Sequence, residues 1–218
     1  MTVHRAARIR EADGSGADLA AFVSIVGETT PERPTSIDEL HWADIAYPGA
    51  TRFLAERDGR PVGAATVGRI YMYPAGFDGL WASLHVVDDS RRQGIGSALL
   101  TAVSDRARLA GKTALHVPGS AARPDSLAFL TRRGFTEYER SKIVRLALEG
   151  REVPAIDLPD GVGLTTLAER PDLAGGVHEV AVETFPDIPG GDEPTAAGPL
   201  AEFRARDVDA RPSRPKRS

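Results

Sequence analysis

Hydrophobic and polar positions follow two alternating periods along the first 150 residues. Apolar or alternating runs of strand length are separated by stretches in which apolar residues recur every three or four positions, as in a helix with one buried face. This pattern predicts strands over 7–12, 51–57, 60–71, 78–87 and 113–117, helices over 15–26, 36–47, 95–110 and 124–134, and two closing strands within 135–148. Such an order predicts an α/β (α+β) fold with a mixed central sheet and helices on both faces.

Turn and cap signals mark several of these boundaries. Asp58-Gly59 between two strand patterns is typical of a tight hairpin turn. Ser36 followed by Glu39 is a capping box at the start of a helix, and Pro124 and Gly134 stand at the two ends of another.

Charge and composition divide the chain near residue 150. Basic and acidic residues are almost balanced up to that point, whereas the remainder is acidic and richer in proline and glycine. We therefore expect a first domain over 1–150, a smaller unit over 151–210, and a disordered basic tail over 211–218.

Several classes of protein are disfavoured by composition. The net charge of −4 argues against a nucleic-acid partner, and no stretch is long and apolar enough to predict a membrane span. The chain contains no cysteine, which excludes disulfides and thiolate chemistry, and His41, His116 and His178 lack metal-ligand spacing. We expect a cytoplasmic protein without a metal. The oligomeric state is left open, with a homodimer as one candidate.

The stretch Arg91-Arg92-Gln93-Gly94-Ile95-Gly96 joins a predicted strand to a predicted helix. Glycine lets a ligand approach the backbone closely, and the first N–H groups of a helix lack intrahelical partners. This turn therefore predicts an anion site, with a phosphate as its natural occupant.

The residues from Leu84 to Gly96 resemble the acyl-CoA-binding motif of the GNAT superfamily of N-acetyltransferases, and those from Phe129 to Phe135 resemble its second motif. The resemblance covers about residues 5–150 and implies acetyl transfer from acetyl-CoA to an amine by direct attack. It implies that the pyrophosphate lies on the N–H groups of residues 92–97 and that pantetheine runs beside 84–87. The implied binding residues are Leu84, Val86, Arg91, Arg92, Gln93, Gly94, Ile95, Gly96 and Ser97.

The catalytic groups are less well defined. Leu130 stands where the family often has a tyrosine that protonates the leaving thiolate. His85 is a candidate general base, but it could equally point to the opposite face of the sheet as an ordinary half-buried histidine. The aromatic residues of the third and fourth predicted strands and of the loop between them either belong to the core or form a wall of an acceptor pocket: Tyr71, Tyr73, Phe77 and Trp81.

The end of the chain repeats features of its beginning. Residues 183–189 are similar to 28–34, and 172–174 to 18–20, so residues 161–189 are interpreted as the first strand and helix of a second, truncated GNAT unit. Residues 195–210 are interpreted as its second helix; the alternative is that the similarity is a coincidence. Within these 218 residues no second glycine turn follows.

A rival function is a non-catalytic acyl-CoA-binding or interaction module derived from a tandem acetyltransferase. The residue at 130 and the truncated repeat favour this alternative, and thiol release on mixing with amines distinguishes the two. A nucleotide-binding domain is disfavoured because the turn lacks the Lys-Ser/Thr of a P-loop and the spacing Gly-x-Gly-x-x-Gly.

Overall fold

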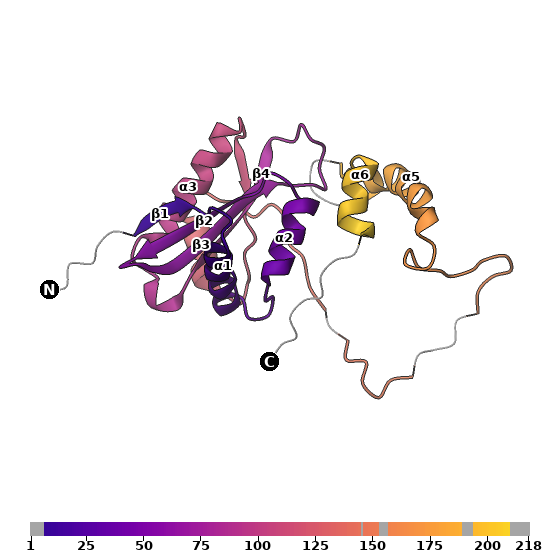
Figure 1. Ribbon diagram of the computed structural model, residues 1–218, viewed down its shortest axis with the longest axis horizontal. Helices are drawn as coiled ribbons and strands as arrows, with labels where there is room; N and C mark the ends of the chain where they lie inside the picture. Colours follow the sequence, from indigo (N-terminus) through magenta and orange to yellow (C-terminus); the bar gives the residue numbers. More distant parts are fainter. Residues whose placement is uncertain (1–6, 145, 153–156, 189–193, 210–218) are drawn as a thin grey trace.

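The computed structural model describes residues 7–144, 146–152, 157–188 and 194–209. Its centre is a five-stranded sheet in the order β1-β2-β3-β4-β5 (Figure 1). The strands are β1 (Arg8–Glu11), β2 (Thr51–Arg57), β3 (Arg60–Arg69), β4 (Gly79–Val86) and β5 (Ala114–His116). The first four are antiparallel neighbours and β5 runs parallel to β4, which confirms the predicted mixed sheet.

Helices cover both faces of this sheet, also as predicted. Helix α1 (Gly16–Thr29) and helix α2 (Ile37–Ala46) share a buried cluster with Leu54 and Ala64 on one face. Helix α3 (Ile95–Leu109) packs on the other face, and α4 (Pro124–Thr131) follows β5. The predicted cap at Ser36 forms, because its hydroxyl accepts a hydrogen bond from the Glu39 N–H, and Ser15 caps α1 in the same way by accepting from the Asp18 N–H.

Strand β4 presents alternate side chains to the two faces. Its even-numbered residues pack under α3: Leu80, Ala82, Leu84 and Val86. The odd-numbered residues Trp81, Ser83 and His85 therefore point toward the face that carries α1. Register with β3 places them opposite the row Gly68, Thr66 and Ala64.

Strands β4 and β5 diverge after a short pairing. Only Gly79, Leu80 and Trp81 of β4 are in register with β5, whose last residue His116 lies opposite Trp81. In the described part of the chain, residues 82–86 of β4 therefore have a strand partner on the β3 side alone. The backbone edge of these residues is open to an extended ligand.

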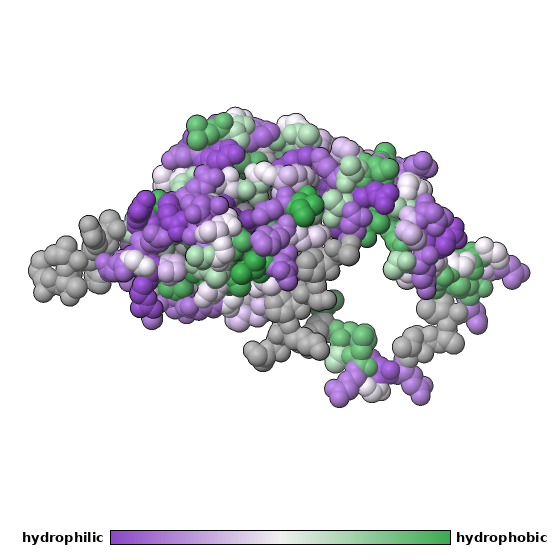
Figure 2. All heavy atoms as spheres, viewed as in Figure 1, coloured by the Kyte–Doolittle hydropathy of each residue, from purple (hydrophilic) through white to green (hydrophobic). Residues whose placement is uncertain are grey.

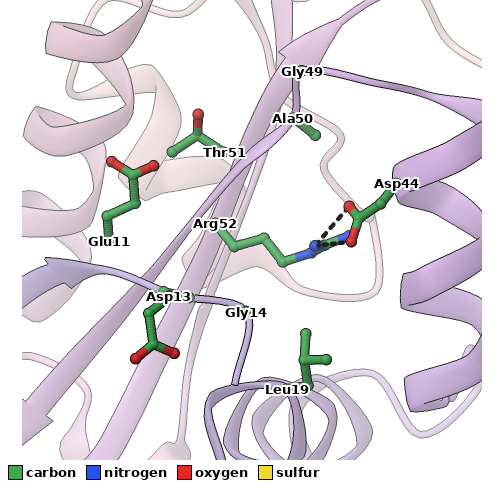
Figure 3. A pocket seen from close by; sticks show the side chains of 10 residues that line it. Glu11, Asp13, Gly14, Leu19, Asp44, Gly49, Ala50, Thr51 and Arg52 are labelled. Carbon is green, nitrogen blue, oxygen red and sulfur yellow. Dashed lines mark hydrogen bonds and ion pairs between the residues drawn. The ribbon is translucent and has the colours of Figure 1, made fainter. Parts of the chain in front are cut away.

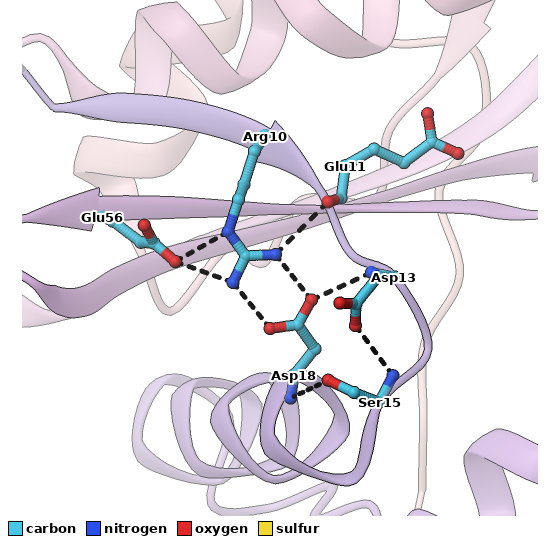
Figure 4. A network of polar contacts seen from close by, with 6 residues as sticks. All are labelled: Arg10, Glu11, Asp13, Ser15, Asp18 and Glu56. Atoms are coloured by element: carbon cyan, nitrogen blue, oxygen red, sulfur yellow. Dashed lines mark hydrogen bonds and ion pairs between the residues drawn. The ribbon is translucent and has the colours of Figure 1, made fainter.

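Helix α1 is anchored to the sheet by an ion-pair network at its first turn (Figure 4). The Arg10 guanidinium on β1 makes two hydrogen bonds of 2.6 Å to the Asp18 carboxylate and contacts Glu56 of β2 at 2.7 Å. Asp18 also accepts the Asp13 N–H at 2.9 Å. The Arg10 side chain holds the pKa of Asp18 far below its usual range.

We expect Asp18→Asn to lower the free energy of unfolding at pH 7 by about 2 kcal/mol, because it removes a charge-assisted pair from a largely buried position. Since the folded-state pKa is depressed, the contribution of Asp18 is complete above about pH 4 and is lost as the pH falls further. Urea unfolding measures the change. Glu137→Gln is the matched control, because its ion pair with Arg140 is exposed and should contribute little; equal effects of the two variants would contradict this account.

The two strands predicted within 135–148 are not formed, and this prediction was wrong. The described residues of this range have no regular secondary structure, and Ile143, Val144, Leu146 and Leu148 are 60–79% exposed. A strand pattern requires a partner edge, and here the chain leaves the sheet after α4 in a long excursion on which apolar side chains stand out (Figure 2).

The helices of the predicted second unit are present, whereas its strand is absent. Helix α5 (Ala174–Thr184) and helix α6 (Leu200–Phe203), the latter continued by a π-helical turn to Val208, share a small cluster around Phe203. The residues from 161 to the start of α5, where its first strand was expected, are not part of the sheet. The predicted disordered tail over 211–218 lies outside the described residues, and the second unit itself stays a prediction.

Helix α6 and the residues directly before and after it pack on the end of β3 and on the loop between β3 and β4. The Ala196 N–H donates to the Met72 carbonyl at 2.8 Å, and the Arg206 guanidinium donates to the Tyr71 carbonyl at 3.1 Å. Glu202 pairs with Arg69 at 3.3 Å. The contacts lie where β3 ends and β4 begins, at the opposite end of β4 from the glycine turn (Figure 1).

Candidate functional site

The glycine turn follows β4 and builds an uncapped helix start. After the short helical turn Asp88–Ser90, Arg92 and Gly94 have φ values of +60° and +83°, and α3 begins at Ile95 with Gly94 as its N-cap. No side chain caps the first turn of α3. Successive amides around left-handed residues, together with the positive end of the helix dipole, form an anion-binding concavity.

The two arginines of the turn have different surroundings. The Arg91 guanidinium donates to the Val86 carbonyl at 3.0 Å and pairs with Asp88 at 2.7 Å, so it ties the turn to the end of β4. Arg92 is exposed at the left-handed position. The Gln93 side chain donates to the Asp89 carbonyl at 2.9 Å. Of the side chains of Arg91, Arg92 and Gln93, only that of Arg92 makes no hydrogen bond within the turn.

The two glycines are required for different reasons. A Cβ on Gly94 would meet no atom within 4 Å, so its positive φ and the open space in front of it are the relevant features. A Cβ on Gly96 would lie 3.2 Å from the Phe129 ring, so this glycine allows α4 to pack against α3.

Arg133 is a cation at this turn that the sequence did not single out. Its guanidinium lies 3.7 Å from the centroid of the Phe129 ring and donates to the Ser97 hydroxyl in the first turn of α3. The turn after α4 thus brings a second arginine, besides Arg92, to the N-terminus of α3. A positive charge three or four residues after the aromatic position of that helix is the signal that could have identified it.

His85 lies on the face opposite α3, at the open part of β4. Its Nδ1 is 2.9 Å from the hydroxyl oxygen of Thr29, the last residue of α1. Burial, and to a smaller extent the nearby Arg123 guanidinium, lower the pKa of His85 below its ordinary value, so the imidazole is neutral at pH 7. Nε2 has no hydrogen-bond partner among the described residues and is not among their buried unpaired atoms, so solvent reaches it.

Other residues considered from the sequence are divided between the core and the surface. Tyr71 and Tyr73 are 8% and 6% exposed and belong to the core, whereas Trp81 is 40% exposed on the same face of β4 as His85. Leu130 lies against Gly119 in the loop before α4. It offers no proton donor there.

A cavity of about 360 Å³ lies away from this site (Figure 3). It is bounded by the loop after β1 and the start of β2, where Arg52 pairs with Asp44 at 2.8 Å. Thr51 is in register with Val67 near the end of β3, and Val67 is opposite Ala82 near the start of β4, so the cavity is remote from the turn that follows the end of β4.

Two further properties concern the described residues as a whole. They contain no group of three or more histidine or acidic side chains arranged to hold a metal ion. None of their helices is long and apolar enough to cross a membrane.

A strand that diverges from its neighbour and leads through a glycine turn into an uncapped helix is the arrangement that the resemblance to acyl-CoA-dependent acyltransferases implied. The chain matches the acetyltransferase (GNAT) family over residues 20–135, more than half of its length, and it belongs to that family. This confirms the predicted acetyltransferase and acetyl-CoA as the acyl donor.

Solved structures of low sequence identity share the fold. A transcriptional regulator from Bacillus halodurans is 20% identical with a TM-score of 0.53, covering 64% of this chain and 99% of its own. The aminoglycoside N-acetyltransferase AAC(6')-Iy, solved with a bisubstrate analogue, is 22% identical with a TM-score of 0.52, covering 66% and 99%. An aminoglycoside acetyltransferase from an uncultured soil metagenomic sample is 19% identical with a TM-score of 0.51, covering 66% and 97%. No curated protein matches the chain.

Proposed function

We propose that this enzyme transfers the acetyl group of acetyl-CoA to an amine by direct attack, without a covalent enzyme intermediate. The observation that carries the proposal is the junction at the end of β4, where an open strand edge, an uncapped glycine turn and a neutral histidine meet.

The donor fits the residues at this junction. The amides of residues 92–97 and the exposed Arg92 would hold the pyrophosphate, with Arg133 adding a positive charge from the turn after α4. The open space in front of Gly94 leaves room for it. Pantetheine would follow the unpaired edge of residues 82–86 and bring the thioester beside His85. Leu84 and Val86 contribute backbone there, since their side chains pack under α3.

His85 is proposed as the general base. The amine nitrogen attacks the thioester carbonyl carbon, the C–N bond forms, and Nε2 of His85 accepts the proton that the nitrogen loses. The C–S bond then breaks and the CoA thiolate takes a proton from water, because Leu130 offers none. The chain has no cysteine for a cysteinyl acyl-enzyme, which agrees with direct attack.

The acceptor is proposed to approach over the face of β4 that carries His85, Ser83 and Trp81. The exposed indole of Trp81 lies four residues from His85, about 13 Å along the strand, and offers a flat surface to the body of an amine. Aminoglycosides are acceptors of two neighbours by name, and we include them among the candidates.

The experiment is a panel of amines, including aminoglycosides, polyamines and lysine peptides, assayed for release of the CoA thiol. Initial rates are measured at several concentrations of both substrates. Double-reciprocal plots of these rates should give intersecting lines, because direct attack requires both substrates to be bound together. Parallel lines would indicate a covalent intermediate and would contradict the mechanism.

The residues after 150 are proposed to form a separate unit that does not bind the donor. The pairing of α5 with α6 supports the interpretation as the start of a second GNAT unit, and their contacts lie at the far end of β4 from the glycine turn.

Deletion of residues 161–218 should therefore leave the affinity for acetyl-CoA within about threefold of the full chain. The melting temperature should fall, because the contacts to Tyr71 and Met72 are lost. Calorimetry on both chains measures the affinity. A truncated chain that folds but does not bind acetyl-CoA would show that these residues complete the donor site.

A further inference from the structure

Three residues from distant parts of the chain meet beside the open edge of β4. Thr29 ends α1, His85 lies on β4, and Arg123 precedes α4. The Thr29 hydroxyl oxygen is 2.9 Å from His85 Nδ1, and the Arg123 guanidinium donates to the Thr29 carbonyl at 2.7 Å. Thr29 is 5% exposed, so its hydroxyl is shielded from bulk water.

The Thr29 hydroxyl has a single proton, and its position decides the tautomer of His85. The hydroxyl donates to the Ile25 carbonyl at 2.8 Å, one helical turn earlier. It can then meet Nδ1 only as an acceptor, so Nδ1 carries the imidazole proton. The lone pair of the neutral ring is left on Nε2, the nitrogen that solvent reaches.

Arg123 keeps this arrangement in place. Its bond to the Thr29 carbonyl satisfies one of the last free carbonyls of α1, where a cation is favoured by the helix dipole. The same positive charge acts on the imidazole and disfavours a second proton on it; among the described residues it is the charged group that acts on His85.

We propose that Thr29 and Arg123 are positioning residues that hold His85 as the Nδ1–H tautomer, with the basic Nε2 turned toward the acceptor. The step from tautomer to rate rests on the proposed function of His85 as general base. The tautomer itself does not depend on that function and can be measured without substrate.

The first test is the ¹⁵N and ¹H NMR spectrum of the full chain labelled in histidine, with His85→Gln identifying the His85 signals. We expect the Nδ1–H tautomer in the unsubstituted protein and in Thr29→Ser, which keeps the hydroxyl. Thr29→Val has nearly the same shape without a hydrogen-bonding group, and we expect a mixture of tautomers. The Nε2–H tautomer in the unsubstituted protein, or identical spectra for all three, would overturn the proposal.

The second test follows kcat and KM against pH in the same variants. Thr29→Val should lower kcat by at least about 10-fold, but by less than the 10²–10⁴-fold that a general base supplies. The Kd for acetyl-CoA should be unchanged, and kcat should recover in Thr29→Ser. Arg123→Gln should move the acidic limb of kcat/KM to higher pH. The positioning roles would be overturned if the acidic limb of kcat/KM did not move in Arg123→Gln. They would also be overturned if kcat were unchanged in Thr29→Val while it was lowered in His85→Gln. The predicted tautomer together with a fully active His85→Gln would instead contradict the general base alone.

Discussion

Gly94→Glu is expected to abolish measurable acetyl-CoA binding, with a loss of affinity of more than about 100-fold. The substitution places a carboxylate in the open space in front of the α3 N-terminus, where the pyrophosphate is proposed to lie. Like charges at that distance repel, and the added side chain also fills the space. Isothermal titration calorimetry with acetyl-CoA measures the affinity, and circular dichroism establishes that the variant is folded.

Gly94→Gln is the matched control for this prediction. It carries the same bulk and the same backbone strain at a φ of +83°, but no charge. Its affinity should lie between those of Gly94→Glu and the unsubstituted enzyme. A folded Gly94→Glu variant with undiminished affinity would remove the pyrophosphate from this turn.

His85→Gln should lower kcat at pH 7 by about 10²–10⁴-fold while leaving the Kd for acetyl-CoA unchanged. Glutamine retains polar contacts of similar reach but cannot accept the proton of the attacking amine. Because the pKa of His85 is lowered, the acidic limb of kcat/KM in the unsubstituted enzyme should lie below about pH 6.5 and should be absent from the residual activity of the variant.

The same shift affects stability. A histidine whose pKa is lower in the folded state destabilises the fold only as the pH falls below about 6.5, because the unfolded chain then binds more protons.

His178→Gln is the matched control for the loss of kcat, since His178 lies on α5 and bonds to the Gly198 carbonyl at 2.8 Å, away from β4. Equal losses of kcat in the two variants would show that His85 has no special role.

Most of the sheet could be predicted because its signals are local. The Asp58-Gly59 turn joins β2 to β3 with positive φ at both residues, and the glycine turn opens α3 at Ile95 as expected. The prediction of two strands within 135–148 failed because strand pairing does not depend on local signals alone. An alternating pattern indicates that a strand is possible, but a strand forms only where it can pair with a free edge of the sheet. The chain leaves the sheet at residues 135–148, so the described residues of that range have no such edge near them.

The glycine turn was predictable from the sequence, whereas the surroundings of His85 were predictable only in part. Glycines at a strand–helix junction indicate an anion from a few consecutive residues. The partners of His85 come from positions 29 and 123, and no spacing in the sequence reveals that they meet. The orientation of His85 follows from strand parity, because Leu84 and Val86 take the α3 face and leave the other face to it.

The most direct test of the central claim compares two amounts in one reaction: the CoA thiol released and the acetylated amine formed, measured by absorbance and by mass spectrometry. We predict equal amounts with any accepted amine, no release without an amine, and no acetyl group on the protein. Binding of acetyl-CoA without amine-dependent release across the whole panel would contradict catalysis and would favour an acyl-CoA-binding module.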